Sequence, residues 1–182
     1  MTENQIEDAV RNGVSALGYP SAFAIRNARI GPEQGQVDLA MFPRNGKTKV
    51  ILVEVKQSTA VDAKCKVVGQ IIMYLTGALQ LSQEGIQLYR DYARNHPDEA
   101  TSTSKTSPKQ IVSGSRSAEE AWKTLTQGTP VERDQIALYI ATDDSPGHQL
   151  EVAVDLLSKV YGLHIGLIQV SESGIQVIKK CP

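Results

Sequence analysis

A chain of 182 residues, 41% apolar and 21% charged, is long enough for one domain with a substantial core and has an ordinary globular composition. Its apolar runs are too short for a membrane-spanning helix, so we expect no membrane partner. The formal net charge of −1 argues against a generally basic surface that coats nucleic-acid phosphates.

The first part of the chain predicts a helix followed by three strands. Thr2 and Gln5 fit a capping box, apolar residues at helical spacing follow, and Gly18 ends the helix. The strands are expected at residues 21–30, 36–42 and 50–55. An Asn-Gly turn signal between the last two strands predicts that they form a hairpin.

The rest of the chain predicts a strong helix, a polar insertion and a second α/β unit. A continuous apolar stripe indicates a helix from Lys66 to about Leu81. A Ser- and Thr-rich stretch then predicts an insertion at about 93–134 that contains one short helix. The elements expected after it are a strand at 135–142, a helix from 144–146 to Gly162, and strands at 164–170 and 174–180. This order predicts a single domain, residues 1–182, with a mixed-sheet α/β fold and helices on the faces of the sheet.

Charged residues converge at the predicted hairpin. Side chains alternate across a strand, so Glu54 and Lys56 share one face of the third strand. On the second strand, Val37 and Leu39 are expected on one face, which leaves Asp38 on the other. The parity of the two strands therefore permits Asp38 to lie beside Glu54.

Two carboxylates and an ammonium in a partly buried place suit metal chemistry. Neighbouring carboxylates repel and need a cation, and oxygen ligands favour a hard ion such as Mg²⁺ or Mn²⁺. Such an ion activates water and stabilises charge on a phosphoryl oxygen, while Lys56 orients the water or stabilises the transition state. The arrangement suits phosphodiester hydrolysis. The alternative is a hairpin end that exposes Glu54 and Lys56 as a weak surface pair.

The charge is unevenly distributed around this hairpin. Between residues 26 and 66, eight basic residues stand against four acidic ones. The excess is compatible with a solvated face, but it also suits the binding of phosphates near the carboxylates. The residues expected to contact nucleic acid are Arg26, Arg29, Lys64 and Lys66.

The two strands resemble a known family. "GQVDLAMF" and "VILVEVKQ" are similar to the active-site strands of the PD-(D/E)XK nuclease superfamily, which includes restriction endonucleases, Holliday-junction resolvases and RecB-type nucleases. Val37 replaces the proline of the family motif, and apolar residues are common there in the RecB-like branch. The run from Gly35 to Asp38 resembles the glycine-x-x-aspartate of that branch.

Two further matches lie on helices. Gln70 and Tyr74 stand where RecB-like members carry glutamine-x-x-x-tyrosine, in a polar line that begins at Lys66. An amphipathic boundary row is the alternative explanation. Glu7 lies eleven residues before Gly18, like the metal-binding glutamate in the first helix of resolvase-like members. Its neighbours Glu3 and Asp8 are rival candidates, and a favourable interaction with the helix dipole is the more common explanation for any single acid in the first turn of a helix.

The resemblance implies a fold, a cofactor and roles for individual residues. The implied fold is the restriction-endonuclease-like three-layer core, with a central mixed β-sheet flanked by helices. The implied ligands of Mg²⁺ or Mn²⁺ are Asp38, Glu54, the Val55 carbonyl and Glu7. Lys56 would position the attacking water, and Gln70 and Tyr74 would support the site or guide the substrate.

The resemblance also implies a substrate and an assembly. DNA rather than RNA is the expected substrate, and a dimer or larger assembly is expected because many such nucleases pair protomers to cut two strands. A second hypothesis is a catalytically inactive nuclease-fold protein that acts as a nucleic-acid-binding or scaffold subunit.

The aromatic residues, the N-terminus and the cysteines add two smaller observations. Tyr89 lies next to Arg90, a mixture that suits either contact with nucleic acid or the edge of an amphipathic helix. The N-terminal residues lack the basic start and apolar run of a signal peptide, and Cys65 and Cys181 match no zinc-binding spacing. We therefore expect a cytoplasmic protein with reduced thiols.

Overall fold

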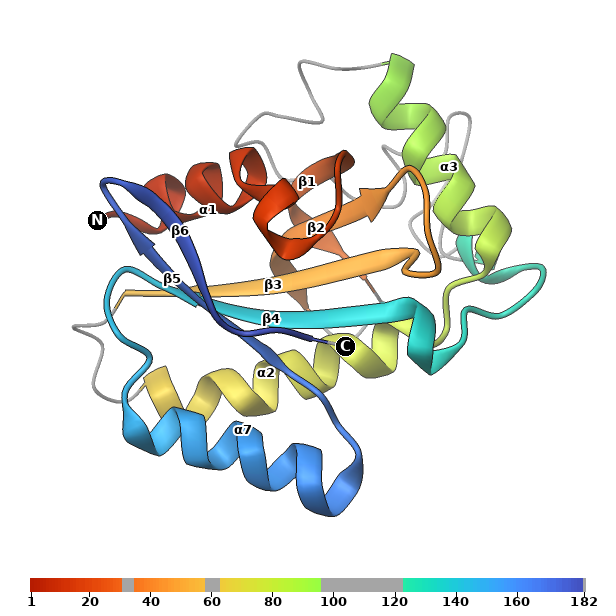
Figure 1. Ribbon diagram of the computed structural model, residues 1–182. Helices are drawn as coiled ribbons and strands as arrows, with labels where there is room; N and C mark the ends of the chain where they lie inside the picture. The colour runs from red at the N-terminus through yellow and green to blue at the C-terminus, as the bar shows by residue number, and fades with distance from the viewer. Residues whose placement is uncertain (31–34, 58–62, 96–122, 182) are drawn as a thin grey trace.

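The structure, a computed structural model, describes residues 1–30, 35–57, 63–95 and 123–181. Its strands form a mixed sheet in the order β1-β2-β3-β4-β5-β6 (Figure 1). The strands are β1 (Ala22–Arg29), β2 (Gln36–Pro43), β3 (Val50–Lys56), β4 (Ile136–Thr142), β5 (Gly166–Ser171) and β6 (Gly174–Lys179). Strands β3, β4 and β5 are parallel, and the other neighbouring pairs are antiparallel. The predicted α/β class with a mixed sheet is confirmed.

Helices cover both faces of the sheet. They are α1 (Glu3–Asn12), α2 (Ala63–Ala78), α3 (Gln83–Asn95) and α7 (His148–Tyr161), with short 3₁₀ helices η1 (Val14–Leu17) and η2 (Arg133–Gln135). On one face, α2, α3 and α7 pack on a core cluster that includes Leu52 of β3. On the other, α1 and η1 pack on a cluster that includes Val53. Figure 1 shows α1 on one side of β3 and β4, and α2 and α7 on the opposite side. None of the helices in the described ranges is long and apolar enough to cross a membrane.

The capping box predicted for the first helix is present, but the helix is shorter than expected. Thr2 and Gln5 exchange both hydrogen bonds of the box. The α-helix ends at Asn12, and the chain tightens into η1 before Gly18, which has φ +95°. At Gly13, a Cβ atom would lie 2.7 Å from the side chain of Ile175, so β6 approaches the backbone closely at the break.

The sequence pattern defined no bounds for a helix at residues 83–95, although an amphipathic helix was one explanation for Tyr89 and Arg90, and the structure forms α3 there. The helix predicted from Lys66 to about Leu81 is α2, which begins at Ala63 and ends at Ala78. The core side of α3 carries Tyr89, which is fully buried and stacks on Phe42 of β2 with 4.9 Å between ring centroids. Tyr89 therefore belongs to the core, which excludes its contact with nucleic acid.

Most of the predicted polar insertion lies outside the described residues, but its end packs on the core. Leu125 and Val131 are buried, and the Ser82 hydroxyl donates to the Leu125 carbonyl at 3.1 Å. The Val131 amide donates to the Leu81 carbonyl at 3.0 Å. The core therefore resumes well before residue 134, because these bonds tie the returning chain to the start of α3.

The C-terminal unit follows the sequence pattern, with two differences. Gly162 ends α7 in the left-handed conformation, as expected. The helix begins at His148 with Gly147 as its N-cap, because Asp144 instead accepts a hydrogen bond from the Ser145 amide. Val160 is 59% exposed although it is apolar, since it lies about 80° around the helix axis from buried Leu150.

Candidate functional site

The strands β2 and β3 separate at the point where the predicted charged residues lie. The predicted hairpin is present, and its paired register ends with Leu39 opposite Val53. Just beyond this pair, the Asp38 carboxylate accepts a 2.7 Å hydrogen bond from the Val55 backbone amide. A side chain thus replaces the backbone partner that β2 would have supplied. We call this place, where β2 and β3 diverge beyond the pair Leu39–Val53, the strand fork.

The alternation of side chains along β2 changes at the strand fork. Val37 packs in the cluster on the α2 side, together with Ala28 of β1, while Leu39 packs in the cluster on the α1 side. The expectation that Val37 and Leu39 share one face is therefore wrong. The physical reason lies on β1, where Asn27 has φ +49° and interrupts the regular pleat beside Asp38.

The strand fork encloses a buried carboxylate. Glu54 is 1% exposed, and its Oε1 atom lies 2.5 Å from Nζ of Lys56, which is 20% exposed. The Oε2 atom of Glu54 is also buried but has no hydrogen-bond partner among the described residues. The alternative of a weak, exposed surface pair does not describe this arrangement, because Glu54 is inside the protein.

Burial and the neighbouring carboxylate alter the ionisation of Glu54. Desolvation, followed by the charge of Asp38, raises the pKa of Glu54 to about 8, although Lys56 acts in the opposite direction. Desolvation alone would lower the pKa of Lys56, but the hydrogen bond and charge of Glu54 outweigh it and raise that pKa. Glu54 is therefore largely protonated at pH 7, because Lys56 does not fully offset the effects of burial and of Asp38.

A second buried carboxylate comes from α1. Glu7 is 5% exposed, and its Oε2 atom lies 3.3 Å from Nε of Arg26, although neither atom completes a hydrogen bond. Burial raises the pKa of Glu7 to about 7; Arg26 opposes this rise, and the charge of Asp38 adds to it. Glu7 thus belongs electrostatically to the strand fork.

The polar row of α2 approaches from the other face of the sheet. The Tyr74 hydroxyl donates to the Gln36 carbonyl at 2.9 Å, at the beginning of β2. Desolvation and the charges of Glu54 and Asp38 raise the pKa of Tyr74, while a hydrogen bond with Gln70 lowers it. The charge of Asp38 therefore acts on Glu7 of α1 and on Tyr74 of α2, two helices that pack on opposite faces of the sheet.

Of the four residues expected to bind nucleic acid, the structure describes the side chains of Arg26 and Lys66, and these two differ in exposure. Arg26 is 3% exposed and pairs with Glu7 and Asp8 of α1, so its assignment to a phosphate-binding surface is wrong. Burial against the first helix explains this difference. Lys66 is exposed at the start of α2. The side chains of Arg29 and Lys64 lie outside the part of the structure that is described.

Two neighbours of the site had not been selected from the sequence. Glu3 was only a rival to Glu7, yet its charge raises the pKa values of both Lys56 and Glu7. Its position four residues before Glu7 on one helix was the available signal. Gln36 contributes only a backbone carbonyl, which no sequence pattern distinguishes.

The oxygen atoms at the strand fork are of the kind that hard divalent cations prefer as ligands. These oxygen atoms come from the Asp38 carboxylate, from Oε2 of Glu54 and from the Val55 carbonyl. The Val55 carbonyl points to the β2 side of β3, as the Val55 amide does, because both groups of one residue in a strand point to the same side. Within the described ranges, no group of three or more His, Cys, Asp or Glu side chains is gathered closely enough to hold a metal. The fit therefore depends on two carboxylates and a backbone oxygen, with Glu7 as a more distant acid.

Comparisons with protein-family models, with curated proteins and with solved structures find no match for this chain.

Proposed function

We propose that this protein is a metal-dependent nuclease that hydrolyses phosphodiester bonds of DNA, with a restriction-endonuclease-like fold of the PD-(D/E)XK type. The observation that carries the proposal is the buried Glu54 carboxylate: its Oε1 atom contacts Lys56, its Oε2 atom has no hydrogen-bond partner in the described part of the chain, and the nearby charge of Asp38 raises its pKa. A buried carboxylate with one unsatisfied oxygen is costly, so its presence favours a functional role for Glu54.

The proposed ligands of Mg²⁺ or Mn²⁺ are Asp38, Glu54 and the Val55 carbonyl, with Glu7 nearby. When bound, such an ion supplies activation of water and stabilisation of charge on phosphoryl oxygens. Asp38 has a fixed orientation, since one of its oxygens accepts from the Val55 amide. This fixed geometry suits a ligand better than a mobile surface acid would.

Lys56 has a separate proposed role. Its Nζ atom lies 2.5 Å from Oε1 of Glu54, and its side chain is partly exposed. The ammonium would therefore contact both the buried carboxylate and a substrate at the surface. A lysine there can orient a water molecule or stabilise charge that develops on phosphorus oxygens. The Tyr74–Gln70 pair would support the site from α2, where Tyr74 ties the helix to the start of β2.

The substrate and setting belong to the same proposal. DNA is favoured over RNA by the resemblance alone, and a dimer and a cytoplasmic location are proposed on the same ground. Lys66 is exposed one turn before Gln70, and we propose that it contacts the DNA backbone.

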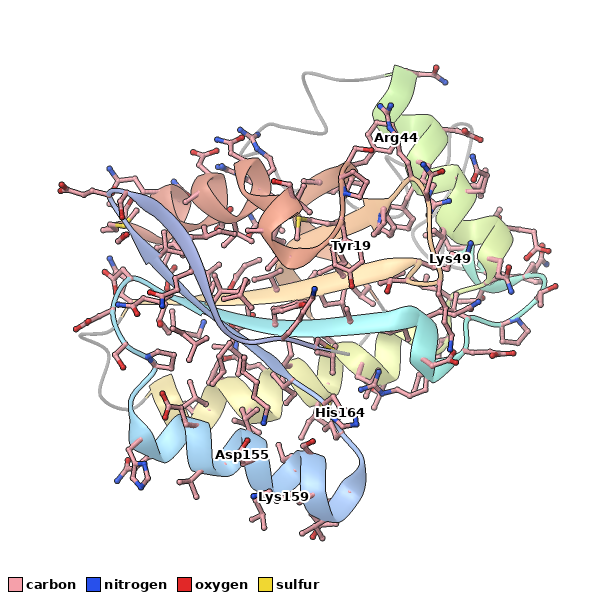
Figure 2. The ribbon with its side chains drawn as sticks, in the orientation of Figure 1. Tyr19, Arg44, Lys49, Asp155, Lys159 and His164 are labelled. Atoms are coloured by element: carbon pink, nitrogen blue, oxygen red, sulfur yellow. The ribbon has the colours of Figure 1, made fainter. Side chains whose placement is uncertain are left out.

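The decisive experiment is cleavage of labelled single-stranded, duplex and branched DNA, and of RNA, with Mg²⁺, with Mn²⁺ or with EDTA. We expect metal-dependent cutting that Glu54→Gln and Lys56→Met each reduce by at least ~100-fold. Binding of DNA to Lys56→Met should be retained. Lys159→Gln is the matched control, because Lys159 is an exposed cation on α7, away from the strand fork (Figure 2).

Two results would contradict the proposal. Cutting that survives in both variants would assign the activity to another site or to a contaminant. An absence of cutting on every substrate, together with no metal binding by calorimetry, would favour the inactive binding or scaffold subunit.

A further inference from the structure

A polar cavity lies at the opposite end of β2 from the strand fork. It has a volume of about 340 Å³ and is lined, among the described residues, by Phe23, Arg44, Gln87 and Arg90. This volume lies within the ~300–1,000 Å³ typical of small-molecule sites. Arg44 is six positions after Asp38, so about 20 Å of extended chain separates the cavity from the strand fork. Figure 2 shows Arg44 beside α3, which packs on β1 and β2.

Arg90 enters the cavity from α3 with only part of its hydrogen-bonding capacity used. One terminal nitrogen donates to the Pro43 carbonyl, at the end of β2. Its Nε atom is buried and has no partner among the described residues. Burial lowers the pKa of Arg90. A guanidinium held in this way favours an anion beside it.

Arg44 supplies a second cation with its plane already fixed. Its guanidinium carbon lies 4.7 Å from the centroid of the Phe23 ring. Stacking on an aromatic ring occupies the face of a guanidinium and leaves its N–H groups free at the edge. No carboxylate is among the described lining residues. The acid on the adjoining turn, Asp91, accepts a 2.9 Å hydrogen bond from the Gln87 amide.

We propose that this cavity binds a phosphate group, either as free phosphate or as the terminal monoester phosphate of a larger compound. Two guanidinium groups match the charge of about −1.5 to −2 that a monoester carries at pH 7. A planar fork of N–H donors also suits the oxygens of phosphate better than it suits chloride. The site does not depend on the proposed nuclease activity, because it lies far from Asp38 and needs no metal.

The test is calorimetric titration with inorganic phosphate in EDTA at constant ionic strength. We expect a dissociation constant of ~1 mM or lower for the unmodified chain, weakened at least ~10-fold by Arg44→Gln and by Arg90→Gln. Lys47→Gln is the charge-matched control, since Lys47 is an exposed cation paired with Asp134 at a different cavity. Asp38→Asn should also bind phosphate normally, which separates this site from the strand fork.

A short oligonucleotide with a 5′-phosphate, compared with its 5′-hydroxyl form, distinguishes the two sources of phosphate. Stronger binding of the phosphorylated form than of free phosphate assigns a nucleic-acid end, whereas equal or weaker binding assigns the free anion. The proposal is overturned if ~10 mM phosphate gives no saturable heat or if Arg44→Gln binds as tightly as the unmodified chain. Because Arg44 is exposed, its variant decides the question even if Arg90→Gln fails to fold.

Discussion

The Asp38 carboxylate accepts a 2.7 Å hydrogen bond from the backbone amide of Val55 on the neighbouring strand. This contact lies just beyond the last residue pair of β2 and β3, so a charged side chain ends the ladder at that point. The same bond orients Asp38 so that its charge raises the pKa of Glu54. The contact that ends the strand pairing therefore also sets the ionisation of a proposed metal ligand.

The first prediction separates the structural role of Asp38 from its charge. Asp38→Asn keeps an oxygen acceptor for the Val55 amide, whereas Asp38→Ala removes it. We expect the asparagine variant to be more stable than the alanine variant by about 1–3 kcal/mol, measured by urea denaturation. Both variants should lose metal-dependent cleavage by at least ~100-fold. Equal stability of the two variants would show that the hydrogen bond does not hold the strand fork together.

The second prediction concerns stability as a function of pH. Burial and Asp38 raise the pKa of Glu54 from 4.5 to about 8. Between pH 5 and pH 8 the unfolded chain is ionised at Glu54 while the folded chain retains the proton. The free energy of unfolding contributed by this group therefore falls as pH rises through that window.

Glu54→Gln should remove this loss. At pH 8 we expect the variant to be more stable than the unmodified chain by about 1–3 kcal/mol, and at pH 5 to differ by less than ~0.5 kcal/mol. Part of the slope should remain, because the pKa of Glu7 is also raised, to about 7. Urea denaturation at several pH values measures the effect, and parallel pH profiles for the two proteins would contradict it.

The third prediction concerns protons released when a metal binds. A divalent ion needs the ionised form of Glu54, so binding of Mg²⁺ or Mn²⁺ should release a proton at pH 7. From Glu54 alone, the apparent affinity should rise by up to ~10-fold per pH unit between pH 6 and 8. Calorimetry in buffers of different ionisation enthalpy counts the protons. Tight binding that is independent of pH, or that survives in Glu54→Gln, would place the metal elsewhere.

The fourth prediction tests the packing of α3 on the chain that returns after the polar segment. A Cβ atom at Gly85 would lie 2.0 Å from the Leu125 carbonyl oxygen, which belongs to the backbone and cannot rotate away. We expect Gly85→Ala to lower the free energy of unfolding by about 3 kcal/mol. Gly69→Ala on α2 is the matched control, because a Cβ there meets nothing within 4 Å. It should raise stability by about 0.5–1 kcal/mol. Equal effects of the two substitutions in urea denaturation would contradict the observed contact.

Local patterns predicted most strands of the sheet, the turn of the hairpin, and the face of β3 that carries its charged residues. Apolar runs with turn signals identified β2 and β3, and Gly46 has the positive φ of +95° that the Asn-Gly turn favours. Strand alternation placed Glu54 and Lys56 on one face, and the two side chains do form an ion pair. These features are local because they follow from backbone sterics and from a period of two residues.

Long-range packing determined what local patterns left open. The burial of Arg26 requires α1 to lie across β1, and the role of Tyr89 requires α3 to cover β2. The sequence around each residue is compatible with an exposed position as well. Only contact between segments that are distant along the chain distinguishes the two states, because the free energy of burial depends on what covers a side chain.

The sequence by itself determined the order of the six strands, the positions of α1, α2 and α7 among them, the hairpin, and the presence of two acids and a lysine at its end. The tertiary structure decided that Glu54 is buried, that Asp38 ends the strand pairing, and that Glu7 from the first helix acts on the same site. The physical reason is that periodicity and turn preferences act over a few residues. Desolvation and charge interactions instead act between groups that only the folded chain brings together.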